Sequence, residues 1–267
     1  MSGPSTSQPS AVRPSGGGAS PVFDERFEGD RLDPSRWLEM YLPHWSEPQR
    51  TRPSHAIEDG VLRLTIAPDQ PEWCPEFDPG VRVSSVQTGH FAGSVGSDRG
   101  QHRFRDGLVV RSHVEPRTLF AHHRGRLEMR ARAWMNPNNL VSLWMIGLED
   151  EPHRSGEITL MEVFGNAADE EGAVVGRGIK RVRDPRLRDE FHETRLPIRI
   201  GDWHDYAYEW TPEGVRFFVD GEQVSACEQS PDYPMQIMLN LYELPDRDGG
   251  GKAPVFEVAH IRAWETQ

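Results

Sequence analysis

The sequence lacks the features that mark several classes of protein. Its 267 residues include only two cysteines, Cys74 and Cys227, which are too few for a disulfide framework. We expect each cysteine to be a small core residue, with a single bridge as the alternative. No apolar run approaches the roughly 18 residues that a membrane-spanning helix needs, so we expect no membrane partner.

Basic residues are outnumbered by acidic ones. The chain has 30 Lys and Arg against 42 Asp and Glu, which gives a formal net charge of -12. A chain this acidic is repelled by phosphate backbones, which argues against a nucleic-acid partner. We expect a monomer.

Apolar residues are almost missing from the first 21 residues, which read MSGPSTSQPSAVRPSGGGASP. A segment of Ser, Pro and Gly cannot bury enough surface to offset the entropy of ordering it, so we predict a disordered tail over residues 1–21. The segment also lacks the apolar core of about 7–15 residues that a secretory signal contains. The sequence does not decide the location: the cytoplasm is the default, and the protein is secreted if the sequence is a processed form.

Short alternating apolar runs, broken by Gly, Pro and Asp, fill the rest of the chain. In GVLRLTIA, Leu62 and Leu64 share one face. Asp220 and Gly221 lie between two apolar flanks, which is the strongest short-range signal for a hairpin. No segment has a sustained 3.6-residue period, and no repeat is present. We predict a single all-β domain over residues 22–267, built as a sandwich or a barrel.

Two glutamates interrupt one of the apolar runs, GEITLMEVFG. Glu157 and Glu162 are five positions apart, so a regular strand would place them on opposite faces. One extra residue at Leu160-Met161, a β-bulge, would bring both glutamates and Thr159 onto one face. We predict this bulge, because bulges are over-represented beside active sites, where they re-aim side chains.

A pair of facing carboxylates suits the hydrolysis of a glycosidic bond. In a retaining enzyme one carboxylate is the nucleophile and the other is the general acid and base, with about 5–5.5 Å between the two carboxyl groups. The spacing alone leaves open a second interpretation, a strand with two solvent-facing glutamates.

Several motifs occur in the order in which one family has them. GEITLMEVFG fits the family signature Glu-x-Asp-x-x-Glu at both glutamates, and the other matching segments are FDERFEGDRLDPSRW, NLVSLWMIG, DWHDYAYEWTPEGVRFFVDG and IMLNLYELP. From about Phe23 to Trp264 the chain resembles glycoside hydrolase family 16, the laminarinase- and lichenase-like retaining β-glucanases. The resemblance implies a β-jelly roll of two packed antiparallel sheets with an open cleft on the concave sheet.

The resemblance also implies roles for single residues. Glu157 matches the nucleophile, Glu162 matches the general acid and base, and Thr159 lies between them in the catalytic strand. Aromatic faces and polar groups would bind the sugar chain. The residues expected in that role are Trp144, Asn139, Lys180, Trp203, His204, Asn240 and Tyr242.

Without the resemblance, several of these residues have a simpler interpretation. Trp144 is then a core residue, and Asn240 is a structural amide that bonds a neighbouring loop. Trp203 and His204 are then a hydrophobic residue at a hairpin end and a surface histidine.

The chain departs from the family at a few positions. Thr159 replaces an Asp, which removes a negative charge, so we expect a lower pKa for Glu162 than in its counterparts unless burial by its apolar neighbours compensates. Lys180 aligns with a frequent histidine, and Leu140 replaces a tryptophan. Ala259 aligns with an Asp that helps to hold a structural calcium in some members, so we expect no bound metal.

The segment over residues 87–126 is rich in His and Arg and looks expanded relative to the family pattern. It contains no HExxH or similar metal-ligand spacing. Two interpretations stay open: a loop that borders the cleft and meets hydroxyls or an acidic group of the substrate, or a solvated surface loop.

These observations predict a retaining endo-glycosidase that hydrolyses a β-glucan, with β-1,3 linkages expected, by double displacement and without a cofactor. The alternative is a carbohydrate-binding protein that keeps the groove and has lost turnover. Both glutamates favour the enzyme, whereas Thr159, Lys180 and Leu140 favour the binding protein or a shifted substrate.

Overall fold

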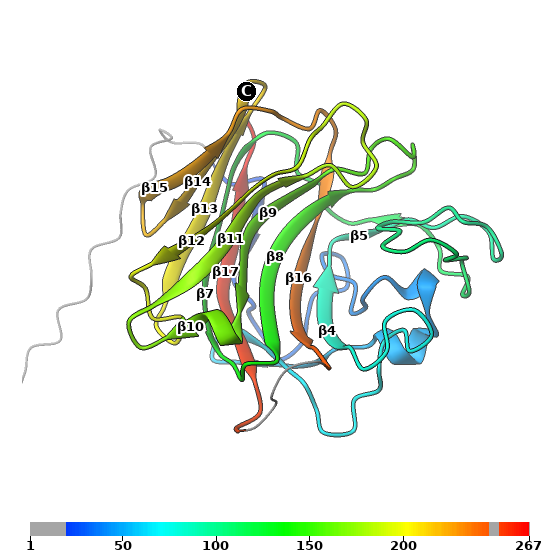
Figure 1. Cartoon of the computed structure of the whole chain (residues 1–267), viewed down its shortest axis with the longest axis horizontal. Helices are drawn as coiled ribbons and strands as arrows, with labels where there is room; N and C mark the ends of the chain where they lie inside the picture. Colours follow the sequence, from blue (N-terminus) through cyan, green and yellow to red (C-terminus); the bar gives the residue numbers. More distant parts are fainter. Residues whose placement is uncertain (1–19, 246–250, 267) are drawn as a thin grey trace, which may run out of the picture.

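Two large antiparallel sheets pack against each other in the part of the protein that the computed structural model describes, residues 20–245 and 251–266 (Figure 1). The spatial order of strands in the first sheet is β15 (Glu222–Cys227), β14 (Gly214–Val219), β13 (His204–Thr211), β7 (Gly125–Trp134), β17 (Val255–Trp264), β3 (Val61–Thr65) and β2 (Ser54–Glu58), with β1 (Phe23–Glu25) paired to β17. The predicted all-β sandwich is confirmed.

The second sheet contains the strand with the two glutamates. Its spatial order is β10 (Ala168–Asp169), β11 (Gly172–Lys180), β9 (Glu157–Phe164), β8 (Asn139–Gly147), β16 (Met235–Glu243) and β4 (Arg82–Gln87), with β12 (Glu190–Leu196) paired to β11. Strands β8 and β9 curve visibly along their length (Figure 1).

The remaining elements of the described residues are short. They are a two-stranded pair, β5 (Gly89–His90) and β6 (Arg117–Thr118), and the 3-10 turns η1 (Pro43–Trp45), η2 (Pro48–Thr51) and η3 (Gly165–Ala167). A helix with the length and apolar character to cross a membrane is not found among the described residues. The tail predicted over residues 1–21 lies outside them, apart from its last two residues.

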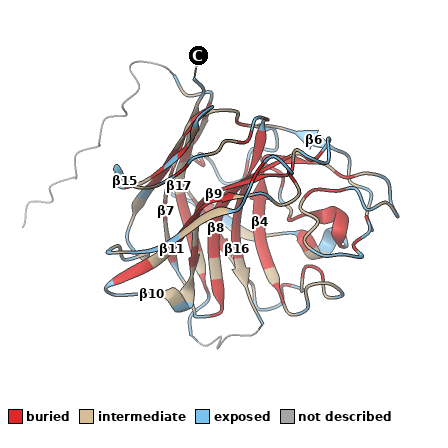
Figure 2. Ribbon diagram, turned by 45° about the horizontal axis from the view of Figure 1, so that its top comes forward, coloured by how far each residue is buried: buried red, intermediate tan, exposed pale blue. Residues whose placement is uncertain are grey.

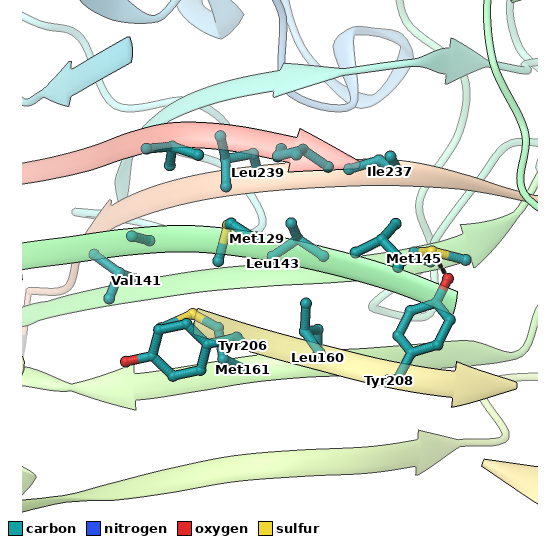
Figure 3. Close-up of a cluster of buried hydrophobic side chains, with 14 of the residues drawn as sticks. Met129, Val141, Leu143, Met145, Leu160, Met161, Tyr206, Tyr208, Ile237 and Leu239 are labelled. Carbon is teal, nitrogen blue, oxygen red and sulfur yellow. Dashed lines mark hydrogen bonds between the residues drawn. The ribbon is translucent and has the colours of Figure 1, made fainter. Parts of the chain in front are cut away.

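Alternation along the strands builds the core between the sheets. Leu62 and Leu64 of β3 are both fully buried there, as their shared face predicts. Figure 3 shows side chains of the two sheets meeting, among them Leu143 and Met145 of β8. The hydroxyl of Tyr208 on β13 donates to Sδ of Met145 at 2.8 Å, which links the sheets. Because successive side chains of a strand point to opposite faces, the residues between these core positions lie on the outer faces of the sheets.

The predicted hairpin at Asp220 and Gly221 is confirmed. The two residues have φ angles of 50° and 84°, the left-handed conformation that a two-residue turn of this kind requires, and they join the paired strands β14 and β15.

Part of the outer face of the second sheet, the face turned away from the first sheet, is covered by the chain itself. The covering side chains come from residues 41–45, 73–81 and 92–110 and pack over β4, β16 and β8. Trp144 of β8 and Met238 of β16 are therefore only 5% and 0% exposed. These segments lie beside β4 (blue to blue-green in Figure 1), and Figure 2 shows buried residues along much of β4 and β8.

Candidate active site

The predicted bulge is present in β9 and decides which side chains face outward. Thr159 lies opposite Trp144 and Met161 lies opposite Leu143, so Leu160 is the extra residue between two neighbouring pairs. Leu160 and Met161 consequently both enter the core, where they are 2% and 0% exposed (Figure 3). This break in alternation returns the next residue, Glu162, to the outer face.

The two glutamates and their neighbours form one contact network. The hydroxyl of Thr159 donates to Oε1 of Glu157 at 2.6 Å. Lys180, on β11, lies opposite Glu157 in the strand register. Its Nζ is 3.3 Å from Oε1 of Glu157 and 3.4 Å from Oε2 of Glu162. Because both oxygens contact the same nitrogen, the distance between them is less than twice 3.4 Å.

The environment of the glutamates differs. Glu157 is buried, whereas Glu162 is partly exposed. Burial raises the pKa of Glu162 above its ordinary value; Lys180 opposes this shift and the charge of Glu157 adds to it. Burial also lowers the pKa of Lys180, but the two carboxylates outweigh this effect, so that its pKa lies above the ordinary value. Burial thus acts on Glu162 in the direction that offsets the missing charge at position 159.

Two glycines of β11 make room beside the glutamates. Gly176 lies opposite Glu162, and a Cβ on it would come within 2.9 Å of the ring of Phe191. Gly178 has a φ of 143°, and a Cβ on it would lie 2.3 Å from a backbone oxygen. The Phe191 ring fills this space, and its centroid is 4.5 Å from Nζ of Lys180. Sequence reasoning missed Phe191, because the glycines that admit it are on a different strand.

His102 is a further residue beside this site. It comes from the His- and Arg-rich segment, and its ring centroid is 5.1 Å from that of Trp144. Its backbone N–H donates to the buried carboxylate of Glu149, which also pairs with Arg183. Burial lowers the pKa of His102, and the charge of Glu157 opposes that shift. This part of the segment therefore borders the glutamates, in line with the first of its two interpretations.

Three expected substrate-binding residues are occupied by contacts within the protein. Asn139 is fully buried and donates to the backbone oxygen of Tyr242. Asn240 is also fully buried, and its Nδ2 donates to the hydroxyl of Tyr242 at 2.9 Å, which in turn bonds Tyr41 at 3.3 Å. The expectation that Asn139 and Asn240 are free to meet sugar hydroxyls is wrong: Asn139 shares the core-side face of β8 with Val141, and Asn240 lies under the covering segments.

Trp203 and His204 were expected to bind the sugar chain, but the structure places them with the first sheet rather than with the sheet that holds the glutamates. They lie at the start of β13, which belongs to the first sheet. The guanidinium carbon of Arg132 is 4.4 Å from the ring centroid of Trp203, and Nδ1 of His204 is 2.7 Å from a carboxylate oxygen of Asp220. Motif order along the chain does not determine sheet membership, which depends on strand pairs that are far apart in sequence.

One group among the described residues brings three metal-ligand types together, Glu190, His192 and Cys227. The Cys227 thiol donates to the backbone oxygen of Glu190, and the carboxylate of Glu190 accepts bonds from the backbone of Glu228 and from Gln229. Cys227 and Cys74 are both free and buried, as expected. A pocket of about 310 Å³ lies elsewhere, at the end of the sandwich where β7 and β9 finish.

Comparisons with known proteins agree with this architecture. Residues 107–250 match the sequence profile of glycosyl hydrolases family 16. A beta-glucanase from Rhodothermus marinus is 33% identical over 103 residues, a match that covers 36% of this chain and 35% of that protein.

Solved structures share the fold over nearly the whole chain. The GlcNAcα1-4Gal releasing endo-β-galactosidase from Clostridium perfringens has a TM-score of 0.83 at 25% identity, covering 96% of this chain and 65% of that one. A laminarinase from Flavobacterium sp. UMI-01 has a TM-score of 0.65 at 19% identity, covering 92% and 100% respectively. The chain thus spans about two thirds of the endo-β-galactosidase and matches about a third of the beta-glucanase.

Proposed function

The chain belongs to glycosyl hydrolases family 16, and from that premise we propose that it is a retaining glycosidase that cleaves internal β-linkages of a polysaccharide. Glu157 attacks the anomeric carbon while Glu162 protonates the oxygen of the leaving group. Glu162 then takes a proton from water, and the water oxygen displaces Glu157 from the sugar.

The observation that carries this proposal is the shared contact of Glu157 and Glu162 with one ammonium group. Both carboxylate oxygens lie within 3.4 Å of Nζ of Lys180. This shared contact allows the separation of about 5–5.5 Å between the carboxyl groups that retaining enzymes have. The raised pKa of Glu162 supports its role as the acid, which must hold a proton before the first step.

Two substrate classes follow from two different observations. The laminarinase- and lichenase-like motifs and the beta-glucanase relative favour a β-glucan, with β-1,3 linkages expected. The TM-score of 0.83 with the endo-β-galactosidase favours a glycan with internal β-galactosyl linkages. Leu140, where the glucanase motif has a tryptophan, is in keeping with a substrate other than a plain β-glucan.

Release of reducing ends from a panel of polysaccharides tests the activity and separates the two substrates. The panel contains laminarin, lichenan, agarose, keratan sulfate and gastric mucin. We expect new reducing ends from one glucan or one galactose-containing glycan. If a member of the panel is bound at matched protein concentration and none is cleaved, the carbohydrate-binding alternative replaces the enzyme.

Azide rescue tests the roles of the two carboxylates. Glu157→Ala should lower turnover by about 10⁴-fold or more. With a 2,4-dinitrophenyl glycoside of the sugar that the panel identifies, azide should restore cleavage and give the glycosyl azide of inverted configuration. The matched variant Glu162→Ala should give the azide of retained configuration. Near-parental rates for Glu157→Ala, or exchanged product configurations, would contradict the assignment.

A further inference from the structure

Lys180 has contacts on three sides at the centre of the site. Its ammonium nitrogen is within 3.4 Å of one oxygen from each glutamate, and the Phe191 ring lies on another side of it. A cation over an aromatic face is attracted by the ring, so Phe191 helps to hold the ammonium group beside the carboxylates. Lys180 was expected to bind substrate, yet its ammonium group is engaged by the protein.

Lysine is rare in this chain. Among the 30 basic residues, Lys180 and Lys252 are the only lysines, and all others are arginines. A lysine ammonium is a compact point charge, whereas the arginine fork is wide and planar. A site that requires one cation within reach of two separate carboxylate oxygens is therefore better served by lysine.

We propose that Lys180 is the positioning residue of this site, a single cation that both glutamates share and that passes to Glu162 alone when Glu157 is covalently bound to the sugar. This inference rests on the function proposed above. In the first step, a bond forms between an oxygen of Glu157 and the anomeric carbon, and the bond to the leaving oxygen breaks as that oxygen takes the proton of Glu162. The contact of 3.3 Å with Lys180 holds the carboxylate of Glu157 in place for this attack.

The charge of Glu157 disappears when it becomes an ester. Lys180 keeps its proton and is then left with Glu162 as its carboxylate partner of the pair. An unshared cation within 3.4 Å stabilises the ionised form of Glu162, which is the form that must take the proton of the attacking water. Lys180 thus favours the ionised form of Glu162 in both steps, but only in the first step does the charge of Glu157 oppose this effect. The lysine moves no proton itself.

Other titratable groups surround this trio from three elements. The charge of Glu193 on β12 raises the pKa of Glu162 further, and His102 of the covering segment is partly buried, which lowers its own pKa. Arg183 is paired with Glu149. Among the described residues, Lys180 is the cation that pairs with both glutamates, so its removal should change the pKa of Glu162 most.

A titration without substrate tests the coupling directly. Carbon-13 spectra of the glutamate carboxyls, with Glu162 identified by its loss in Glu162→Gln, follow its protonation in the parent protein and in Lys180→Met. We expect the pKa of Glu162 to rise by at least about one unit in Lys180→Met, because burial and Glu157 then act unopposed. Lys252→Met, the matched control that removes the other lysine, should leave it unchanged. If Glu162 has the same pKa in Lys180→Met and in the parent, the proposal is overturned.

The two lysines also allow a test that needs no variant of Lys180. In protein labelled only at lysine, one of two side-chain signals should shift as Glu162 titrates, and that shift should vanish in Glu162→Gln. A lysine spectrum that is indifferent to Glu162 would overturn the proposal even if Lys180→Met failed to fold.

Chemical rescue separates a charge effect from a structural one. Lys180→Cys followed by alkylation with 2-bromoethylamine rebuilds an ammonium group of nearly the same length. In Lys180→Cys, we expect the pH profile for turnover of a 2,4-dinitrophenyl glycoside to shift upward by about one unit. Alkylation should return this profile toward that of the parent. The parent, whose free cysteines are buried, receives the same treatment as the control. If azide rescue supports the roles of both glutamates but alkylation leaves the profile displaced, the positioning role fails and the proposed function stands.

Discussion

The hydroxyl of Thr159 donates a hydrogen bond of 2.6 Å to Oε1 of Glu157, the same oxygen that lies 3.3 Å from Nζ of Lys180. Two donors therefore converge on one oxygen of the proposed nucleophile. Thr159 is fully buried, so water does not replace its hydroxyl if that group is lost. The residue that departs from the family signature keeps a contact with the nucleophile and contributes no charge.

Removal of that hydroxyl should slow the reaction. Thr159→Val keeps the shape of the side chain but not the donor, and a hydrogen bond to a charged group contributes about 1.5–3 kcal/mol. We expect kcat/KM to fall by about tenfold or more, whereas Thr159→Ser, which keeps the hydroxyl, should stay within about threefold of the parent. Equal rates for Thr159→Val and Thr159→Ser would show that the bond does not position Glu157 for attack.

Introduction of a charge at the same position should move the pH profile. In Thr159→Asp a third carboxylate lies beside the two glutamates and disfavours the ionised form of Glu162, so its pKa rises further. The acid then stays protonated to higher pH, and the alkaline limb of kcat/KM should shift upward. Thr159→Asn has a similar shape without the charge and should leave the limb in place. A limb that is the same in Thr159→Asp and Thr159→Asn would refute the electrostatic reasoning.

The bulge residue should matter for stability. Leu160→Ala removes a side chain that is 2% exposed in the core, and such substitutions cost about 2–5 kcal/mol. Leu140→Ala, a matched change at a partly exposed position on β8, should cost clearly less. Urea unfolding of both variants measures the difference. Equal losses would mean that Leu160 does not pack in the core as described.

The pair of His204 and Asp220 should stabilise the protein in a pH-dependent manner. Burial lowers the pKa of His204, but Asp220 outweighs this, so the folded-state pKa lies above the ordinary value of about 6.5. The stabilisation is then complete below the unfolded-state pKa and is lost as the pH rises through the folded-state pKa. His204→Gln should lower the free energy of unfolding by about 1 kcal/mol at pH 5.5 and by much less at pH 9. A loss that is the same at both pH values would count against the ion pair.

Trp203 should prove structural. Its ring packs on Arg132 of the first sheet, and β13 is not a strand of the sheet that holds the glutamates. We expect Trp203→Ala to lower the melting temperature while kcat/KM per folded molecule changes by less than about twofold. The contrasting variant is Phe191→Ala, which removes the ring beside Lys180 and should lower kcat/KM. Equal kinetic effects of the two variants would contradict this placement.

Local patterns in the sequence were sufficient for much of the fold. The face shared by Leu62 and Leu64, the turn at Asp220 and Gly221, and the bulge in β9 each depend on residues close together in the chain. The bulge could be predicted because two charged side chains five apart are tolerated on one face only if an extra residue intervenes.

Contacts between distant strands could not be predicted in the same way. Lys180 meets both glutamates because the register of β11 against β9 places it opposite Glu157, and that register is set by tertiary pairing. His102 reaches Trp144 from a long segment without regular structure of its own. Asn240 has the expected polar character and the expected face, but its availability depends on segments from other parts of the chain.

The covered part of the outer face also bears on the lengths of the products. A sugar chain that crosses the second sheet passes over strands about 4.8 Å apart. On one side of β9 lies β8, where the ring of His102 packs against Trp144. Beyond β8, the outer faces of β16 and β4 are covered by side chains of the protein itself. On the other side, Lys180 and Phe191 are partly exposed. A bound chain can therefore extend past the scissile bond in one direction much further than in the other. Chromatography of early products should accordingly show one short fragment of nearly constant size, rather than the broad ladder that a groove open at both ends would release.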